Sequence, residues 1–297
     1  MPIQIQMDMV MTNETEVGVT DKFVALREGA PKEMLRSYDK LGSSGSFSMK
    51  IANMPEGDKE RTVAAESELQ GKTVKFLWNE EEQKYDLSFH ESDADIALLE
   101  NLDEDMDVRG VLPGKEVAEG DTWEIDVKSL RWLLMPGGNL KLKPTSSGES
   151  GEEMMPGMDD MGDLSEMVGD LLEGKATAEY KGIQEIDGGK YGVIHLTVKI
   201  ASSNDMTETV QSKLKDLPEQ VESMTIESMD VALSSESEGT VLWNLASGHV
   251  HSIDMSGKMK MDMDIAMKLG VQGTEMALEQ QMSLSGTVAV KLTVTDN

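Results

Sequence analysis

Apolar and polar residues alternate with a period of two along much of the chain, which is the pattern of half-buried β-strands. The first run has Ile3, Ile5, Met7, Met9 and Met11 on one side and polar residues between them. A looser alternation continues to Leu26, and Glu28-Gly29-Ala30-Pro31 then supplies a turn. The prevalence of this pattern predicts a mainly β protein.

Hairpins account for most of the remaining chain. In residues 66–91, two alternating runs flank the polar tip Asn79-Glu80-Glu81-Glu82, and Asp187-Gly188-Gly189 forms a tight turn between two further strands. Three long strands are expected at residues 231–245, 250–267 and 274–294. Long strands in adjacent hairpins predict strongly curved, half-barrel-like antiparallel sheets.

A few short helices interrupt the strands. Ser92-Asp93 has the composition of an N-cap ahead of the apolar residues 96–102, and a second short helix is expected near residues 210–217. Residues 34–41 fit a short helix and a strand equally well.

The composition changes between Pro144 and Gly174 to Gly, Ser, Met and acidic residues, with a single helical turn near residues 164–172. We interpret residues 144–174 as a linker or excursion. It divides the chain into an N-terminal β lobe with short helices (1–143) and a C-terminal β lobe of long hairpins (175–297).

Charge and cysteine content exclude several classes of function. The chain has 297 residues, of which 56 are acidic and 27 basic, giving a net charge of −29. This charge disfavours nucleic acids and direct binding to anionic membranes. The absence of Cys excludes thiol catalysis, zinc–thiolate sites and iron–sulfur clusters.

No apolar run approaches the 18 residues of a membrane-spanning helix, and the strand pattern begins directly after Met1. The alternatives are a cytoplasmic protein and one whose leader has been removed, and we expect the second: an extracytoplasmic protein, periplasmic or secreted.

A series of short motifs gives the chain a resemblance to a known group of proteins. The motifs are Asp39-Lys40-Leu41, Leu69-Gln70-Gly71-Lys72-Thr73, Leu112-Pro113-Gly114-Lys115-Glu116-Val117, Gly120-Asp121-Thr122-Trp123, Pro136-Gly137-Gly138 and Gly239-Thr240-Val241-Leu242-Trp243 followed by Gly248. In this order they resemble uncharacterised secreted β-rich proteins common in planctomycetes. The resemblance implies an extracytoplasmic protein of unknown function, distantly similar to the half-barrel lipoprotein-carrier fold. It assigns no functional residues.

Methionine is the most unusual feature of the composition, with 24 Met beside only four Trp, four Tyr and four Phe. On one unbroken strand, five of them share a face because all are odd-numbered: Met255, Met259, Met261, Met263 and Met267. Flexible thioether side chains suit an apolar ligand of variable shape, so these five residues are the candidate ligand-binding set. The alternative is a packed core in which Met takes the place of Leu, Ile or Phe.

Three features suggest metals, and none makes a complete site. Met154 to Met161 is a dense Met cluster that could bind Cu(I), but it lacks a nearby His and fits an acidic linker. His249 and His251 lie on one side of a strand without an identifiable third ligand, so exposed strand residues explain them better than a metal site does.

The third feature, Asp103-Glu104-Asp105-Met106-Asp107, begins like a calcium loop. Val108 and Gly114 then occupy the positions where an EF-hand requires Gly and Glu. A solvated acidic helix end explains the run without an ion. We therefore predict no metal and no cofactor.

Neither a Gly-x-Ser-x-Gly elbow nor a phosphate-binding loop is present, and we expect a protein without catalytic activity. The leading hypothesis is a protein that binds or carries a lipid or a lipidated segment on the Met-lined concave sheet. The alternatives are a structural or protein-interaction module of the cell envelope with fully packed sheets, and a metal-binding protein that uses Met and carboxylates.

Overall fold

The computed structural model describes residues 3–51, 61–133, 135–145, 172–213, 223–271 and 274–295. Its strands are β1 (Ile3–Arg27), β2 (Ala30–Ile51), β3 (Arg61–Ser67), β4 (Thr73–Asn79), β5 (Lys84–Phe89), β6 (Thr122–Ile125), β7 (Leu142–Pro144), β8 (Gly174–Ile186), β9 (Gly189–Asp205), β10 (Ser223–Asn244), β11 (His249–Val271) and β12 (Thr274–Thr293). The helices are η1 (Ile96–Leu99), η2 (Arg109–Val111), η3 (Val127–Leu133) and α2 (Thr207–Lys213).

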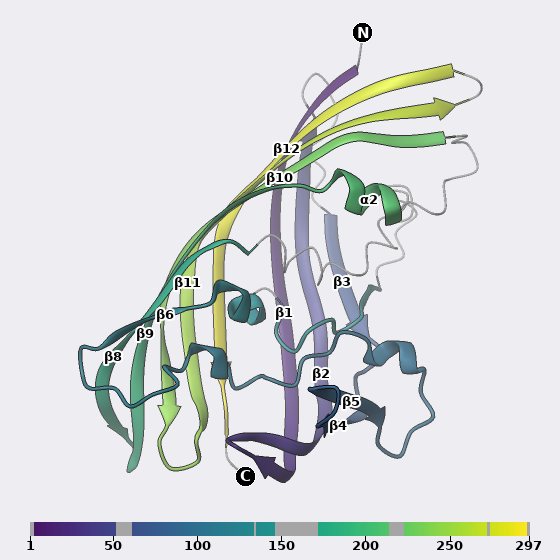
Figure 1. Cartoon of the computed structure of the whole chain (residues 1–297). Coiled ribbons are helices and arrows are strands. Elements are labelled where there is room, and N and C mark those ends of the chain that lie inside the picture. The colour runs from purple at the N-terminus through teal and green to yellow at the C-terminus, as the bar shows by residue number, and fades with distance from the viewer. Residues whose placement is uncertain are drawn as a thin grey trace.

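These strands form one sheet that curls into a half-barrel (Figure 1). The order along it is β5-β4-β2-β1-β12-β11-β10-β9-β8-β6, and β3 joins through β2 and β7. Five pairs of sequence neighbours form antiparallel hairpins: β1–β2, β4–β5, β8–β9, β10–β11 and β11–β12. The prediction of a mainly β protein with long, curved antiparallel sheets is confirmed.

A parallel pair joins the two halves of the chain. β1 lies beside β12, from Ile3 opposite Leu278 to Met9 opposite Leu284. Below this junction the sheet holds two clusters of buried apolar side chains, one with residues from Val17 to Leu142 and one with residues from Val108 to Val294. The predicted linker falls largely in residues 146–171, outside the described residues, and the two-lobe division stays a prediction.

Local sequence explains the hairpin ends. Asp187 and Gly188 both have positive φ, 50° and 83°, between the paired residues Ile186 and Gly189. Two consecutive positive φ angles give a type I′ turn, whose twist matches that of the flanking strands. The predicted hairpin at this position is confirmed, as is the one formed by β4 and β5.

Residues 34–41, for which the sequence left helix and strand open, belong to β2. Met34, Arg36 and Tyr38 alternate as fully buried side chains, so this segment follows a strand period. The helix after the β4–β5 hairpin is the 3-10 helix η1. Asp95, rather than Ser92-Asp93, caps it by accepting a hydrogen bond from the backbone N–H of Ala97.

The short helix expected near residues 210–217 is α2, which begins at Thr207, and residues 214–222 lie outside the description. β10 begins at Ser223, whereas its pairing with β9 begins only at Asp230. Side chains of α2 occupy this edge. The backbone N–H of Ile226 donates to Gln211 Oε1 (2.6 Å), and that of Met229 to Thr207 Oγ1 (2.8 Å). The helix therefore covers a strand edge that would otherwise be open to pairing.

Glycines allow close strand contact where β10 and β11 curve. A Cβ atom added to Gly239 would lie 2.6 Å from Met255 Cα, and one added to Gly257 would lie 2.6 Å from Ser237 Cα. Neither glycine has a positive φ, so the constraint is space and not backbone conformation. Only a residue without a side chain fits such an approach between neighbouring backbones.

We expect Gly257→Ala to lower the free energy of unfolding by about 1–3 kcal/mol, because the added methyl group must push β10 and β11 apart. Gly286→Ala on β12 is the matched control, since an added Cβ there meets nothing within 4 Å. This control is expected to be neutral or to stabilise by up to about 1 kcal/mol. Urea unfolding of both variants checks the prediction, and equal midpoints would contradict it.

Candidate ligand-binding face

The five candidate methionines all lie on β11, on the face that packs against the apolar cluster with residues from Val108 to Val294. Met255 is buried, with 2% of its surface exposed, whereas Met259, Met261, Met263 and Met267 are half-buried. The lower end of the row is therefore part of the core. The upper four side chains are half-exposed.

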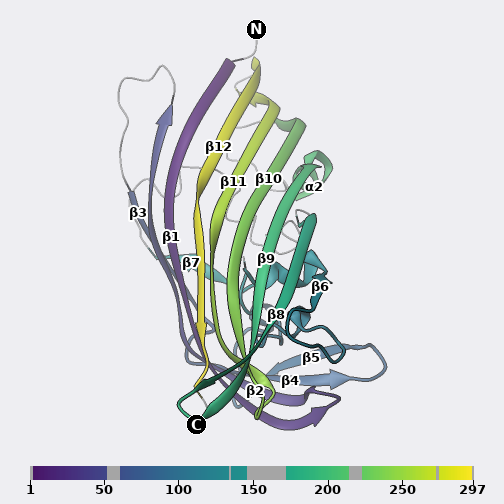
Figure 2. The same cartoon turned by 90° about the vertical axis from the view of Figure 1, so that its left-hand side faces the viewer.

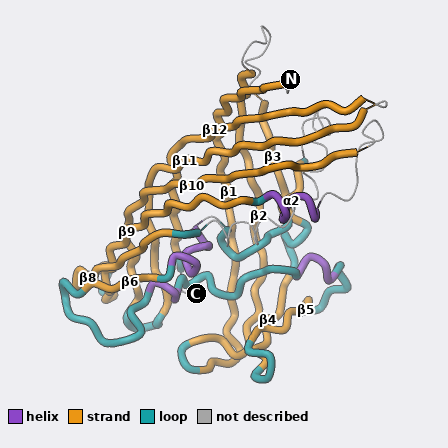
Figure 3. Tube along the Cα trace, turned by 45° about the horizontal axis from the view of Figure 1, so that its top comes forward, coloured by secondary structure: helices purple, strands orange, loops and turns teal. Residues whose placement is uncertain are grey.

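Neighbouring strands extend this apolar row. Met261 lies between Leu233 of β10 and Leu284 of β12, and Met263 lies between Val231 and Met282. The side chains of Leu284 and Met282 are also half-exposed. An apolar face three strands wide results, and Figure 3 shows how β10, β11 and β12 run side by side through it.

A small cavity lies at the level of Met255 and Met259. Its volume is about 30 Å³, and it is lined by Leu130, Leu172, Val198, Ile200, Leu233, Ser235, Ser237, Met255, Ser256, Met259, Val288 and Val290. A water molecule needs roughly 10–15 Å³ on this measure, so the cavity has room for two or so. A lipid-sized molecule would have to lie along the face above the cavity.

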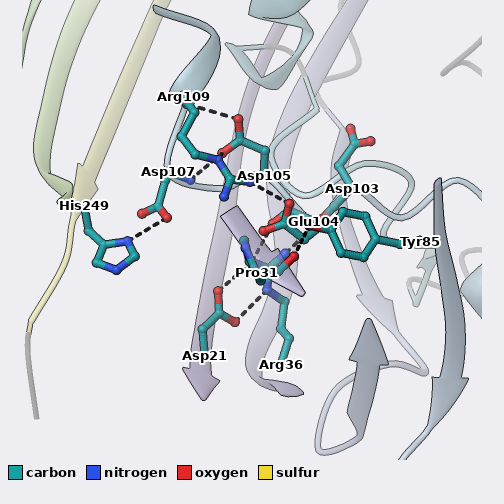
Figure 4. A network of polar contacts seen from close by, with 10 residues as sticks. All are labelled: Asp21, Pro31, Arg36, Tyr85, Asp103, Glu104, Asp105, Asp107, Arg109 and His249. Carbon is teal, nitrogen blue, oxygen red and sulfur yellow. Dashed lines mark hydrogen bonds and ion pairs between the residues drawn. The ribbon is translucent and has the colours of Figure 1, made fainter. Parts of the chain in front are cut away.

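A buried arginine organises the lower end of the molecule (Figure 4). Arg36 on β2 is 1% exposed. It donates from Nε and Nη2 to the carboxylate of Asp21 on β1 (2.8 and 2.6 Å). It also donates to the backbone carbonyl oxygens of Asp103 and Glu104 (2.9 Å each). One guanidinium thus holds β1, β2 and the segment before η2 together.

A second arginine continues the network. Arg109 Nη2 lies 2.6 Å from Glu104 Oε2, and its Nε lies 3.3 Å from Asp105 Oδ1. Burial raises the pKa of the Glu104 and Asp105 carboxyls, and the charge of Arg109 opposes that rise. Asp105 also accepts hydrogen bonds from the backbone N–H groups of Asp107 and Arg109. The interpretation of residues 103–107 as a solvated acidic helix end is wrong, because the segment is half-buried and its carboxylates pair with Arg109, Arg131 and His249.

His249, the first residue of β11, connects this network to the C-terminal half. Its Nδ1 lies 2.9 Å from Asp107 Oδ2, and its ring stacks on Phe23 of β1 with centroids 4.8 Å apart. The ring of His251 lies against that of Tyr191 instead, tilted by 36°, with centroids 4.4 Å apart. Both imidazoles are half-buried and have protein partners. The interpretation of the two histidines as exposed strand residues is therefore wrong.

The described residues contain no group of three or more His, Asp or Glu arranged to hold a metal ion. The Met cluster at residues 154–161 lies outside this description. In the same described part, no helix is both long and apolar enough to cross a membrane.

Comparisons with known proteins returned no relative: no family model, no curated protein and no solved structure matches the chain. Any functional conclusion must therefore rest on the arrangement of the chain's own residues.

Proposed function

We propose that the half-barrel binds an apolar ligand, such as a lipid or a lipidated segment, along the Met-lined face of β10, β11 and β12. The observation that carries the proposal is the half-exposure of Met259, Met261, Met263 and Met267 beside further half-exposed apolar residues on β12. These methionine side chains are partly exposed although they pack against the core, and an apolar surface that is not fully covered is one mark of a binding site.

The choice of methionine supports a ligand of variable shape. Its side chain is unbranched and has three rotatable bonds, so a row of such residues can repack around different acyl chains. Leu and Val on β10 supply a more rigid wall on one side of the row, at Leu233 and Val231. The extracytoplasmic setting implied by the resemblance is part of the same proposal.

One observation favours a second candidate. The cavity of about 30 Å³ is too small for a lipid, which suits a structural or protein-interaction module whose sheet is fully packed. In that case the half-exposed face would be a contact surface for another protein. The two candidates differ in whether the purified protein takes up a small apolar molecule.

Binding of a fluorescent polyunsaturated fatty acid to the delipidated protein tests this difference. We expect saturable binding by the natural chain and at least about a tenfold loss of affinity for Met261→Asp, because a carboxylate would enter the centre of the apolar face. Thr287→Asp is the matched control, since Thr287 is exposed on β12 with the opposite side-chain parity to Leu284. Equal affinities of the two variants, or no binding by the natural chain, would favour the interaction module.

A further inference from the structure

Exposed apolar side chains collect at the end of the half-barrel opposite the β1–β12 junction. Within the described residues, eight large apolar side chains are at least 36% exposed, and five of them belong to three hairpins. These five are Phe23, Val24 and Leu26 near the end of β1, Ile183 on β8 and Leu245 after β10. The largest exposed fraction among them is 65%, at Leu26, and Leu245 is 49% exposed.

The three hairpin turns lie together, as Figures 1 and 2 both show at the lower end of the molecule. Stacking of Phe23 on His249 joins the β1–β2 and β10–β11 hairpins. A hydrogen bond from the backbone N–H of Leu245 to the carbonyl oxygen of Lys190 (3.1 Å) joins the β10–β11 and β8–β9 hairpins. The exposed side chains therefore form one rim.

A layer of Trp and Tyr residues lies near the same turns. Trp78, Tyr85, Tyr191 and Trp243 are half-buried, and each lies within two residues of a strand end. The hydroxyl group of Tyr85 donates to the carbonyl oxygen of Pro31 (2.6 Å), which places β5 beside the β1–β2 turn. Trp and Tyr with one apolar side and one polar group are typical of the level of lipid headgroups.

The three hairpins of the rim also carry far less net charge than the chain as a whole. Residues 22–33 contain three basic and two acidic residues, residues 180–192 contain two of each, and residues 243–252 contain none. The three hairpins are thus close to neutral on a protein of net charge −29. The β4–β5 turn beside them carries Glu80, Glu81 and Glu82, which suit the cationic choline groups of zwitterionic lipid and repel anionic lipid.

We propose that this hairpin end docks onto the surface of a zwitterionic lipid bilayer, with the exposed Phe, Val, Leu and Ile side chains inserted and the Trp and Tyr layer among the headgroups. The inference goes beyond the ligand-binding proposal and does not depend on it. Single apolar side chains on separate turns match a fluid interface, which closes around each of them, better than they match a rigid protein surface.

Sedimentation of the full chain with phosphatidylcholine vesicles tests the proposal. We expect the natural chain to pellet with the vesicles and the Leu26→Asp/Leu245→Asp variant to lose at least about tenfold in partitioning, because burial of each leucine contributes about that factor. Ile96→Asp is the matched control, since Ile96 is 75% exposed on η1, which is not part of the three hairpins, and this variant should bind like the natural chain.

Unfolding midpoints of all variants establish that each is folded, and Val24→Asp replaces the double variant if that variant does not fold. The proposal is overturned if the natural chain stays in the supernatant, if it binds only phosphatidylglycerol vesicles, or if the rim variant binds as well as the Ile96 control. Light scattering supplies another result that would overturn the proposal. If the natural chain is a dimer and the rim variant is a monomer, the rim is a contact between two copies.

Discussion

Arg36→Met should lower the free energy of unfolding by about 3–5 kcal/mol, the range expected when one member of a buried ion pair is removed. The substitution would leave the Asp21 carboxylate without its bidentate partner. It would also leave the carbonyl oxygens of Asp103 and Glu104 without the donors that now satisfy them. Urea unfolding at neutral pH measures the difference.

An exposed ion pair in the same sheet provides the control. Lys40 Nζ lies 2.7 Å from Glu16 Oε2, and both side chains are more than 60% exposed. Lys40→Met is expected to change stability by less than about 1 kcal/mol, because water already screens that pair. Similar losses in the two variants would show that Arg36 does not organise the lower end of the fold.

Tyr38→Phe should make the protein more resistant to alkali. Tyr38 is fully buried, its hydroxyl group has no hydrogen-bond partner among the described residues, and burial raises its pKa to about 12. In the unfolded chain the phenol ionises near pH 10, so between pH 10 and 12 the unfolded state binds fewer protons than the folded state. Stability that depends on this group is present below pH 10 and is lost as the pH rises.

The expected loss is about 2–3 kcal/mol at pH 12, from two pKa units at 1.36 kcal/mol each. Other groups titrate in the same range, so the quantity to measure is the difference between the natural chain and Tyr38→Phe at pH 8, 10 and 12. At pH 8 Tyr38→Phe should be at least as stable as the natural chain, because a buried hydroxyl group without a partner costs about 1–3 kcal/mol and Phe removes that cost. Parallel stability curves across this range would contradict the account.

The pattern of the sequence was sufficient for the strands and the side-chain parity of β11. Alternation determines which residues share a face, so Met255 and Met261 could be placed together without a structure. The turn at Asp187-Gly188 was equally readable, because few residue pairs adopt two successive positive φ angles.

The sequence did not reveal how the halves join or how the lower end is held. The parallel pairing of β1 with β12 connects residues about 275 positions apart, and no local pattern encodes such a contact. The ion network was missed because acidic residues are so numerous that no single carboxylate stands out. One signal was available: Arg36 alternates with Met34 and Tyr38, which places an arginine on a buried face.

The half-exposed methionines follow from the same architecture. The η3 helix supplies Leu130 to the lower core, where Met255 is buried, whereas the described residues leave Met259 to Met267 only half-covered. A sheet that is packed below and half-exposed above offers an apolar wall on a stable base. We therefore expect the ligand to lie along this wall.

Photolabelling with a diazirine-containing fatty acid, followed by trypsin digestion and mass spectrometry, tests that claim most directly. Cleavage after Lys260 and Lys268 releases the peptide Met261–Lys268, which carries Met261, Met263 and Met267. We expect this peptide to be labelled, and we expect unlabelled fatty acid to compete the label away. Labelling confined to peptides outside β10, β11 and β12, or label that excess fatty acid does not displace, would contradict it.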